Sequence, residues 1–148
     1  RHRREAGLAR ADGFDGNPQT RALSGGACAV RDITDPALPG ELARAHYAWA
    51  VCLEVWEHLP AAHEPALAAA LGAAARRGLV VSVATPGQGG LGHVNEREHA
   101  DVLAVLRATA PHLVVDERAG DAIRHELAQH VHVARSHERS GKRPHHNT

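Results

Sequence analysis

A glycine-rich run, residues 85–95 (TPGQGGLGHVN), carries the side chains of this chain that are best placed by type to do chemistry. It follows an apolar stretch, residues 79–84, that reads as a strand. It contains Gln88 and ends in His93 and Asn95, which can do acid–base or hydrogen-bonding work. Glycines let a backbone approach a ligand closely, and loops at the carboxyl ends of strands are where open α/β sheets bind ligands. We therefore interpret the run as a site and not as a flexible connector.

Two carboxylates stand at the ends of the first two expected strands. Asp15 ends the strand-like residues 11–15, where an acid can accept both hydroxyls of a ribose. Asp32 follows residues 27–30, where its carboxylate can accept from an adenine amino group while the backbone N–H of Ile33 or Thr34 donates to the ring. Taken singly, each aspartate also suits a turn or a cap. Their common placement favours a ligand site at one edge of a sheet.

A third strand end adds acids and a histidine. Residues 47–53 are continuously apolar, as in a strand buried on both faces of a parallel sheet. Glu54, Glu57 and His58 follow within five positions. Glu57 and His58 also suit the exposed start of a helix, but a histidine at the carboxyl edge of a sheet is a candidate general base.

The elements that must position these groups alternate between strands and helices, which predicts an α/β fold with a mostly parallel sheet covered by helices. Asn95 and Glu98 have the spacing of a capping box. Pro36, Pro39 and Gly40 predict a loop. The expected strands are residues 11–15, 27–30, 47–53, 79–84, 113–115 and 131–134, and the expected helices are residues 64–75, 95–111 and 119–129.

Composition bounds the class of protein. The 148 residues suffice for one domain, and 17 basic against 17 acidic residues provide no general grip on nucleic acid. Cys28 and Cys52 lie in apolar stretches and read as small buried thiols. No apolar run approaches the roughly 18 residues of a membrane span and no signal peptide opens the chain, so we expect a soluble, intracellular and most readily cytoplasmic protein. The chain has no methionine and opens on RHRR, which indicates a fragment.

Thirteen histidines raise the alternative of a His-rich metal-binding protein. His130 and His132 alternate, and more histidines follow in residues 136–148, which we expect to form a disordered tail after a domain of residues 1–135. There is no His-Glu-x-x-His motif, and Pro60 interrupts any helix that starts at Glu57 and His58. The sequence alone therefore predicts no specific metal site.

Taken in order and spacing, four segments of the chain resemble a class I S-adenosylmethionine-dependent methyltransferase. They are DGNP (residues 15–18), DIT (residues 32–34), CLEVWEHLP (residues 52–60) and PGQGGLGHVN (residues 86–95). The last resembles the PGQGGxGHVN loop that one group of these proteins carries after the fifth strand. The resemblance covers residues 5–135 and implies a Rossmann-like sheet with helices on both faces, S-adenosylmethionine as cofactor, and an acceptor that is a small molecule or a protein.

The resemblance also implies a role for each candidate residue. His58 and His93 are the candidate catalytic bases, and Glu57, Gln88 and Asn95 are the candidate acceptor-binding residues. The expected cofactor-binding residues are Asp15, Gly16, Asp32, Ile33, Leu53 and Glu54.

Two features of that family are missing from this chain, the first strand and the glycine-rich motif I that follows it. That strand is central in the family fold, between the strands at residues 11–14 and 48–53. Its loss leaves a gap of two strand spacings, about 10 Å, so either these neighbours pair directly or the fragment folds poorly. We expect a partial methyltransferase domain that is inactive by itself, or alternatively a non-catalytic binding module derived from one.

Overall fold

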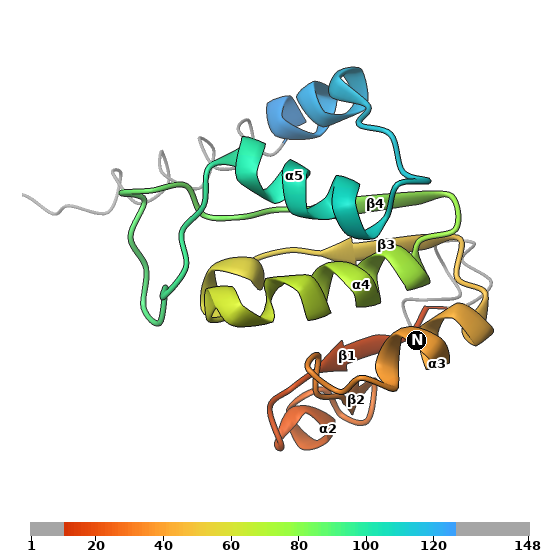
Figure 1. Cartoon of the computed structure of the whole chain (residues 1–148). Coiled ribbons are helices and arrows are strands. Elements are labelled where there is room, and N and C mark those ends of the chain that lie inside the picture. The colour runs from red at the N-terminus through yellow and green to blue at the C-terminus, as the bar shows by residue number, and fades with distance from the viewer. Residues whose placement is uncertain (1–10, 127–148) are drawn as a thin grey trace, which may run out of the picture. The chain divides into compact units, whose positions relative to one another are not determined.

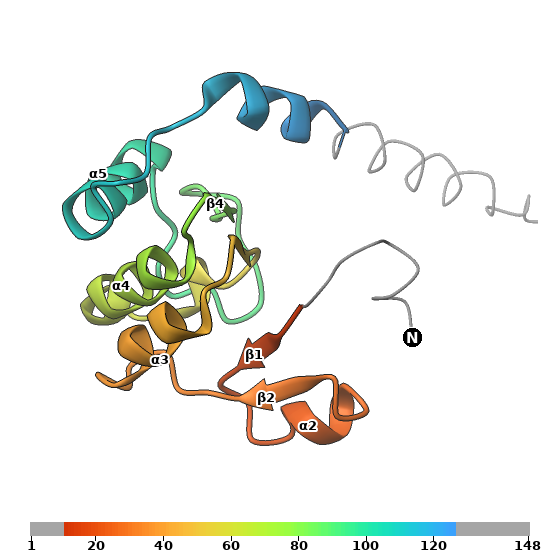
Figure 2. The ribbon, with the colours of Figure 1, turned by 90° about the vertical axis from the view of Figure 1, so that its right-hand side faces the viewer.

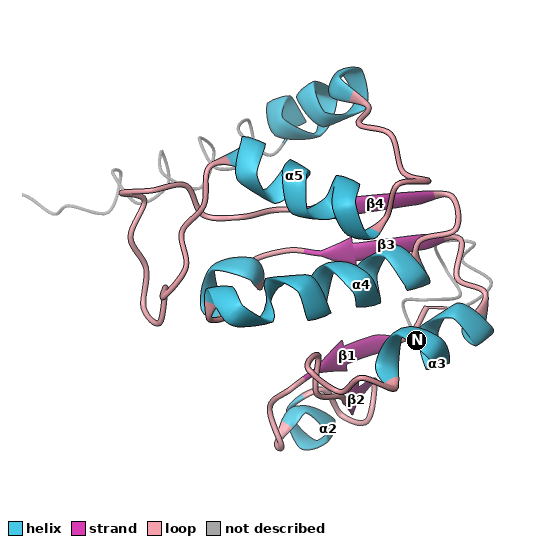
Figure 3. Cartoon of the chain, viewed as in Figure 1, coloured by secondary structure: helices cyan, strands magenta, loops and turns pink. Residues whose placement is uncertain are grey.

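The computed structural model describes residues 11–126 (Figure 1). The chain divides into two compact units, Arg1–Leu113 and Val114–Thr148. In the first unit the elements are β1 (Gly13–Asp15), α2 (Thr20–Leu23), β2 (Cys28–Val30), α3 (Leu38–Ala45), β3 (Trp49–Cys52), the 3-10 turns η1 (Trp56–His58) and η2 (Ala61–His63), α4 (Glu64–Ala74), β4 (Gly78–Val81) and α5 (His99–Thr109). Figure 3 shows how much of this unit is loop.

The strands form two separate parallel pairs. β1 pairs with β2 and β3 pairs with β4, with Asp15 opposite Val30 and Cys52 opposite Val81. Within residues 11–126 no strand pairing joins β1 to β3, so direct pairing, the first of the two alternatives for these neighbours, is wrong (Figure 2). The fold is mixed α/β with short parallel strands, and the single Rossmann-like sheet that we expected is replaced there by two small ones.

The β3–β4 pair carries the larger part of the core. Ala50 and Cys52 of β3 turn toward the helices, where Cys52 joins a buried cluster made with residues of α4, α5 and η1. Trp49 and Val51 point the other way and are 59% and 66% exposed. The prediction of a strand buried on both faces is therefore wrong, because only one face of β3 is covered. The cluster consists of Cys52, Trp56, Leu67, Ala68, Leu71, Val102 and Leu106.

α3 replaces the loop that the sequence indicated. Pro39 lies in its first turn, where the missing N–H would have no helical partner in any case. Leu38 and Leu42 are four residues apart and pack against Ala70 and Ala74 of α4. The helical spacing of the apolar residues thus predicts this segment correctly, whereas the prolines do not.

The two longer helices differ in how well their starts were predicted. α4 begins at Glu64 as expected, and Pro65 again occupies the first turn. α5 begins at His99 with no side-chain cap, so the capping box of Asn95 and Glu98 is wrong. Asn95 does not cap α5, because its side-chain amide donates to the buried carboxylate of Glu64.

The second unit contains one described helix, at residues 117–126, which agrees with the expected helix as far as the description reaches. Residues 113–115 are not a strand, which corrects that prediction. The expected strand at residues 131–134 and the tail at 136–148 lie outside the described residues. Among the helices of residues 11–126, none has the length and apolar character needed to cross a membrane.

Candidate functional site

A cavity of about 890 Å³ lies between the segments that contain β1 and β3. Its wall includes the loops that leave the carboxyl ends of β1, β2 and β3, and His58 lies on it as well. A smaller cavity of about 470 Å³ beside β2 and α3 is lined by none of the predicted site residues. All six residues expected to bind the cofactor line the larger cavity: Asp15, Gly16, Asp32, Ile33, Leu53 and Glu54.

Asp15 combines a turn role with a free oxygen. Its Oδ1 accepts from the Asn17 N–H at 2.7 Å and from the Thr20 hydroxyl at 3.2 Å, which fixes the turn after β1. Its Oδ2 has no hydrogen bond within residues 11–126. One oxygen of an exposed carboxylate therefore remains open to a ligand at the cavity wall.

Asp32 is arranged in the same way after the end of β2, with one oxygen in a turn and the other open. Its Oδ1 accepts from the Thr34 hydroxyl at 2.7 Å and from the Thr34 N–H at 2.8 Å. These two bonds, the hydroxyl first, hold the pKa of Asp32 below its ordinary value. The carboxylate is thus kept ionised beside Ile33. Of the two N–H groups that the sequence offered to the same ligand, those of Ile33 and Thr34, the Thr34 N–H is already bound to Asp32.

Glu54 follows β3 in an unusual conformation. Its φ is 55°, in the left-handed region that residues other than glycine rarely adopt. Ser82 holds it there, because the Ser82 hydroxyl accepts from the Glu54 N–H at 2.9 Å and donates to Glu54 Oε1 at 2.7 Å. Backbone strain of this kind tends to occur at functional sites.

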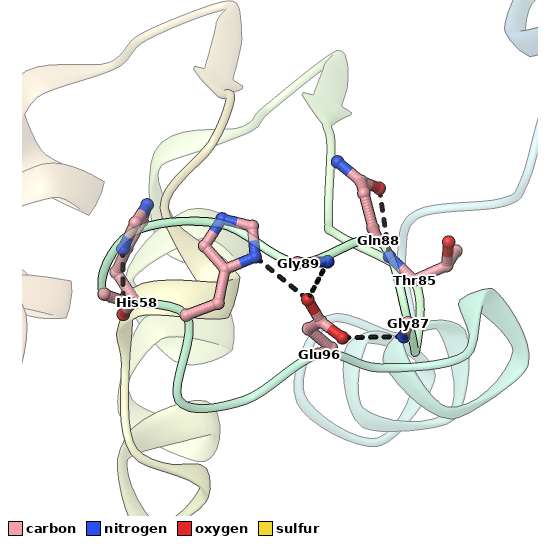
Figure 4. Close-up of polar contacts among 8 residues, drawn as sticks. His58, Thr85, Gly87, Gln88, Gly89 and Glu96 are labelled. Atoms are coloured by element: carbon pink, nitrogen blue, oxygen red, sulfur yellow. Dashed lines mark hydrogen bonds and ion pairs between the residues drawn. The ribbon is translucent and has the colours of Figure 1, made fainter.

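The glycine-rich run is organised around Glu96, a residue that sequence reasoning missed (Figure 4). The N–H groups of Gly87 and Gly89 donate to its two carboxylate oxygens at 2.8 and 2.7 Å, and His93 Nδ1 lies 3.1 Å from Oε1. The bond from His93, followed by those from Gly87 and Gly89, lowers the pKa of Glu96. The loop therefore binds an anion that belongs to the chain itself.

The two predicted bases lie together at the end of the loop. The His58 and His93 rings meet edge to face with centroids 5.0 Å apart. His58 Nδ1 lies 3.1 Å from the Gly92 carbonyl oxygen, which can only accept, so Nδ1 carries the proton and donates (Figure 4). Each ring is thereby oriented by a hydrogen-bond partner of its Nδ1 in the glycine-rich run or directly after it. The second ring nitrogen, Nε2, takes no part in these bonds.

Glu57 lies beside these rings but is fully buried. Neither carboxylate oxygen has a hydrogen-bond partner among the described residues. One carboxylate oxygen of Glu57 and one ring nitrogen each of His58 and His93 all lie within 4.8 Å of one another. Burial and, to a smaller extent, the charge of Glu57 raise the pKa of Cys52 to about 11.

Asn95 and Gln88 are occupied by internal bonds. Asn95 is buried and its amide donates to Glu64 Oε1 at 2.8 Å, while Gln88 Oε1 accepts from the Thr85 N–H at 3.3 Å. Glu64 also accepts from the Trp56 indole at 3.1 Å. Glu64 is the second residue that sequence reasoning missed, because its place before a proline read only as the start of a helix.

Comparison of the chain with protein-family models, with curated proteins and with solved structures gives no match.

Proposed function

We propose that the chain is a partial S-adenosylmethionine-dependent methyltransferase domain that transfers a methyl group to an unidentified acceptor. The single observation that supports this is that all six expected cofactor residues line one cavity. Its volume, about 890 Å³, lies within the usual range for small-molecule sites. We also propose a Rossmann-like ancestry for the two parallel pairs and a place of action inside the cell.

The cavity residues suit the adenosine part of such a cofactor. The open oxygen of Asp15 would accept from the ribose hydroxyls, as in other parallel-sheet nucleoside sites. Asp32 would accept from the adenine amino group, and the Ile33 N–H would donate to the ring. Leu53 supplies apolar contact, and the strained backbone at Glu54 fixes the direction in which the chain leaves the cavity.

S-adenosylmethionine, when bound, supplies an electrophilic methyl group, so the protein needs mainly to orient the acceptor and to take a proton from it. His58 suits that proton transfer because it lines the cavity and, with Nδ1 donating to Gly92, has Nε2 free to accept. His93 is the second candidate. Glu57, Gln88 and Asn95 would act on the acceptor by shaping the loop, given the internal bonds of the last two.

A non-catalytic binding module is the alternative, and one observation favours it. Asn95, an expected acceptor-binding residue, is buried against Glu64 and so turned away from an acceptor. Both readings share the cavity residues. They differ in whether a chain that binds the cofactor also transfers its methyl group.

The test is calorimetric titration of the purified chain with S-adenosylhomocysteine. We expect binding near the micromolar range, about −8 kcal/mol, and a loss of at least about tenfold in Asp15→Ala. Asp35→Ala is the matched control, since Asp35 also accepts a turn N–H, that of Ala37 at 2.9 Å, but does not line the cavity. A folded chain that does not bind, or equal losses in both variants, would contradict the proposal. Binding without methyl transfer to any acceptor tested would favour the module.

A further inference from the structure

We propose that Glu57, His58 and His93 form a binding site for a divalent first-row transition-metal ion. Their ligand atoms lie within 4.8 Å of one another, and the set combines two imidazoles with one carboxylate. Imidazole suits zinc, iron, copper and nickel, and two histidines with one carboxylate leave coordination positions open for a further ligand. Calcium and magnesium prefer sites made of oxygen alone.

The strongest evidence is the burial of Glu57 without a partner. The residue is 0% exposed and both carboxylate oxygens lack a hydrogen bond within the described part of the chain. A buried charge is costly unless it is paired or coordinates a metal. The neighbouring Trp56, by contrast, has its indole N–H satisfied by Glu64. A cation between Glu57 and the two rings would supply the partner that the Glu57 carboxylate lacks among the described residues.

The histidines have the outer partners that metal ligands usually have. Metal-bound histidine almost always donates its other ring N–H to a carbonyl or a carboxylate, which fixes the tautomer and the ring orientation. His58 Nδ1 has the Gly92 carbonyl and His93 Nδ1 has the Glu96 carboxylate, each at 3.1 Å (Figure 4). A metal bound through Nε2 would leave both of these outer bonds in place.

Two glycines of the loop make room for the rings. A Cβ on Gly90 would lie 2.3 Å from His93 Nε2, and a Cβ on Gly92 would lie 3.4 Å from His58 Nδ1. Any side chain at position 90 would thus displace the nitrogen assigned to the metal. The glycine-rich sequence is explained by the ring positions as well as by the bonds to Glu96.

The cluster needs only a small adjustment to bind an ion. Ligand atoms bound at about 2.0–2.2 Å stand about 3–4 Å apart around a metal, so the widest separation has to close by roughly 1 Å. His58 is exposed and can move by this amount. Because His58 also lines the strand-end cavity, the open coordination positions would lie next to that cavity. The site does not depend on the proposed methyl transfer, and while a metal is bound His58 cannot act through Nε2 as the base of that transfer.

The experiment is titration of the full chain with Zn²⁺ by calorimetry and with Co²⁺ followed by visible absorption, which reports coordination by protein ligands. The histidines of residues 136–148 are a separate source of metal binding, so a full-length variant with His137, His145 and His146 replaced by Asn is titrated in parallel. We expect this variant to keep one high-affinity site. If the tail replacements remove all tight binding, the proposal is wrong and the metal is bound adventitiously.

Substitutions in the cluster then locate the site. In the tail-substituted background, His58→Ala and Glu57→Gln should each weaken Zn²⁺ binding by at least about 100-fold, and Glu96→Gln should weaken it by about 10–100-fold, as an outer partner does. His63→Ala is the matched control, because His63 is also exposed and also ends a 3-10 turn. Equal affinity in His58→Ala and His63→Ala would overturn the proposal, and His58, being exposed, keeps this test valid if Glu57→Gln fails to fold.

Discussion

The strand-end cavity and the glycine-rich loop treat their polar groups in opposite ways. At the cavity, Asp15 and Asp32 each use one carboxylate oxygen for a turn and leave the other open. In the loop, the N–H groups of Gly87 and Gly89 are already bound to Glu96. A glycine-rich loop after a strand thus does not by itself indicate an external anion, because a carboxylate of the same chain can occupy it.

This difference assigns different tasks to the two regions. The cavity has the open oxygens and the volume that a ligand needs, while the loop is a closed hydrogen-bonded scaffold that orients His58 and His93. The scaffold depends in turn on the buried carboxylate of Glu64. We therefore expect substitutions in the scaffold to change stability and those in the cavity to change binding of the proposed cofactor.

The largest effect should come from Glu64→Ala. Glu64 Oε1 accepts from Trp56 and Asn95, so its loss leaves two donors without their acceptor, and it also removes the ion pair with Arg97, whose Nε lies 3.1 Å away. We expect the free energy of unfolding to fall by about 3–5 kcal/mol, measured by denaturant unfolding.

Glu41→Ala is the control for this prediction. Glu41 lies 3.7 Å from Arg31 in an ion pair whose side chains are about half exposed, and such pairs contribute about 0–1 kcal/mol. A loss in Glu64→Ala no greater than in Glu41→Ala would mean that the scaffold does not depend on Glu64.

The next effect has the opposite sign. Without metal, Glu57→Leu should raise the free energy of unfolding by about 1–3 kcal/mol, because an unpartnered buried polar group is replaced by an apolar one of similar size. Zn²⁺ at 100 times its dissociation constant should stabilise the wild type by about 2.7 kcal/mol and leave the variant unchanged. A destabilised Glu57→Leu would show that the carboxylate already has a stabilising role in the metal-free protein.

Local sequence signals predicted most elements of the fold but not how the strands pair. α4 follows from Leu67 and Leu71 at helical spacing and a proline in the first turn, and these signals act within one segment. α3 was missed because its prolines outweighed the spacing of Leu38 and Leu42 in our reading. The separation of β1 from β3 depends on contacts between distant segments, and the continuous apolar run around β3 gave no sign that one face would be exposed.

The candidate site was predictable where strand geometry alone brings residues together. Asp15 and Asp32 meet at one cavity because β1 and β2 are parallel neighbours, and the ends of parallel strands share an edge. The burial of Asn95 depends on Glu64, which is 31 positions away in sequence. The bonds from the loop N–H groups to Glu96 were not predictable either, because an acid that follows a histidine and an asparagine is first interpreted as a solvent-exposed residue.

Alanine substitutions at two neighbouring glycines can distinguish the effect of backbone strain from the effect of displacing the His93 ring. Gly89 has a φ of 68° and open space around a Cβ, so Gly89→Ala should lower the free energy of unfolding by about 1–2 kcal/mol through backbone strain alone. Gly90→Ala should instead displace the His93 ring, at a cost of about 0.5–1.5 kcal/mol for its bond to Glu96. NMR signals of the His93 ring should shift in Gly90→Ala and stay in place in Gly89→Ala. The reverse pattern would contradict the ring position.

The smallest effect is a pH dependence carried by Glu96. Bonds from His93 and the two glycines lower its pKa in the folded protein from the ordinary value of 4.5, so the folded state binds its proton less readily than the unfolded state does. The stability that Glu96 contributes is therefore fully present above pH 4.5 and is lost as the pH falls through the lowered value. Glu96→Gln should be less stable than the wild type above pH 4.5, and the difference should shrink on further acidification, as measured by denaturant unfolding at a series of pH values. A difference that stays constant on acidification would mean that the glycines bind Glu96 as a neutral acceptor, and the loop would then have no preference for an anion.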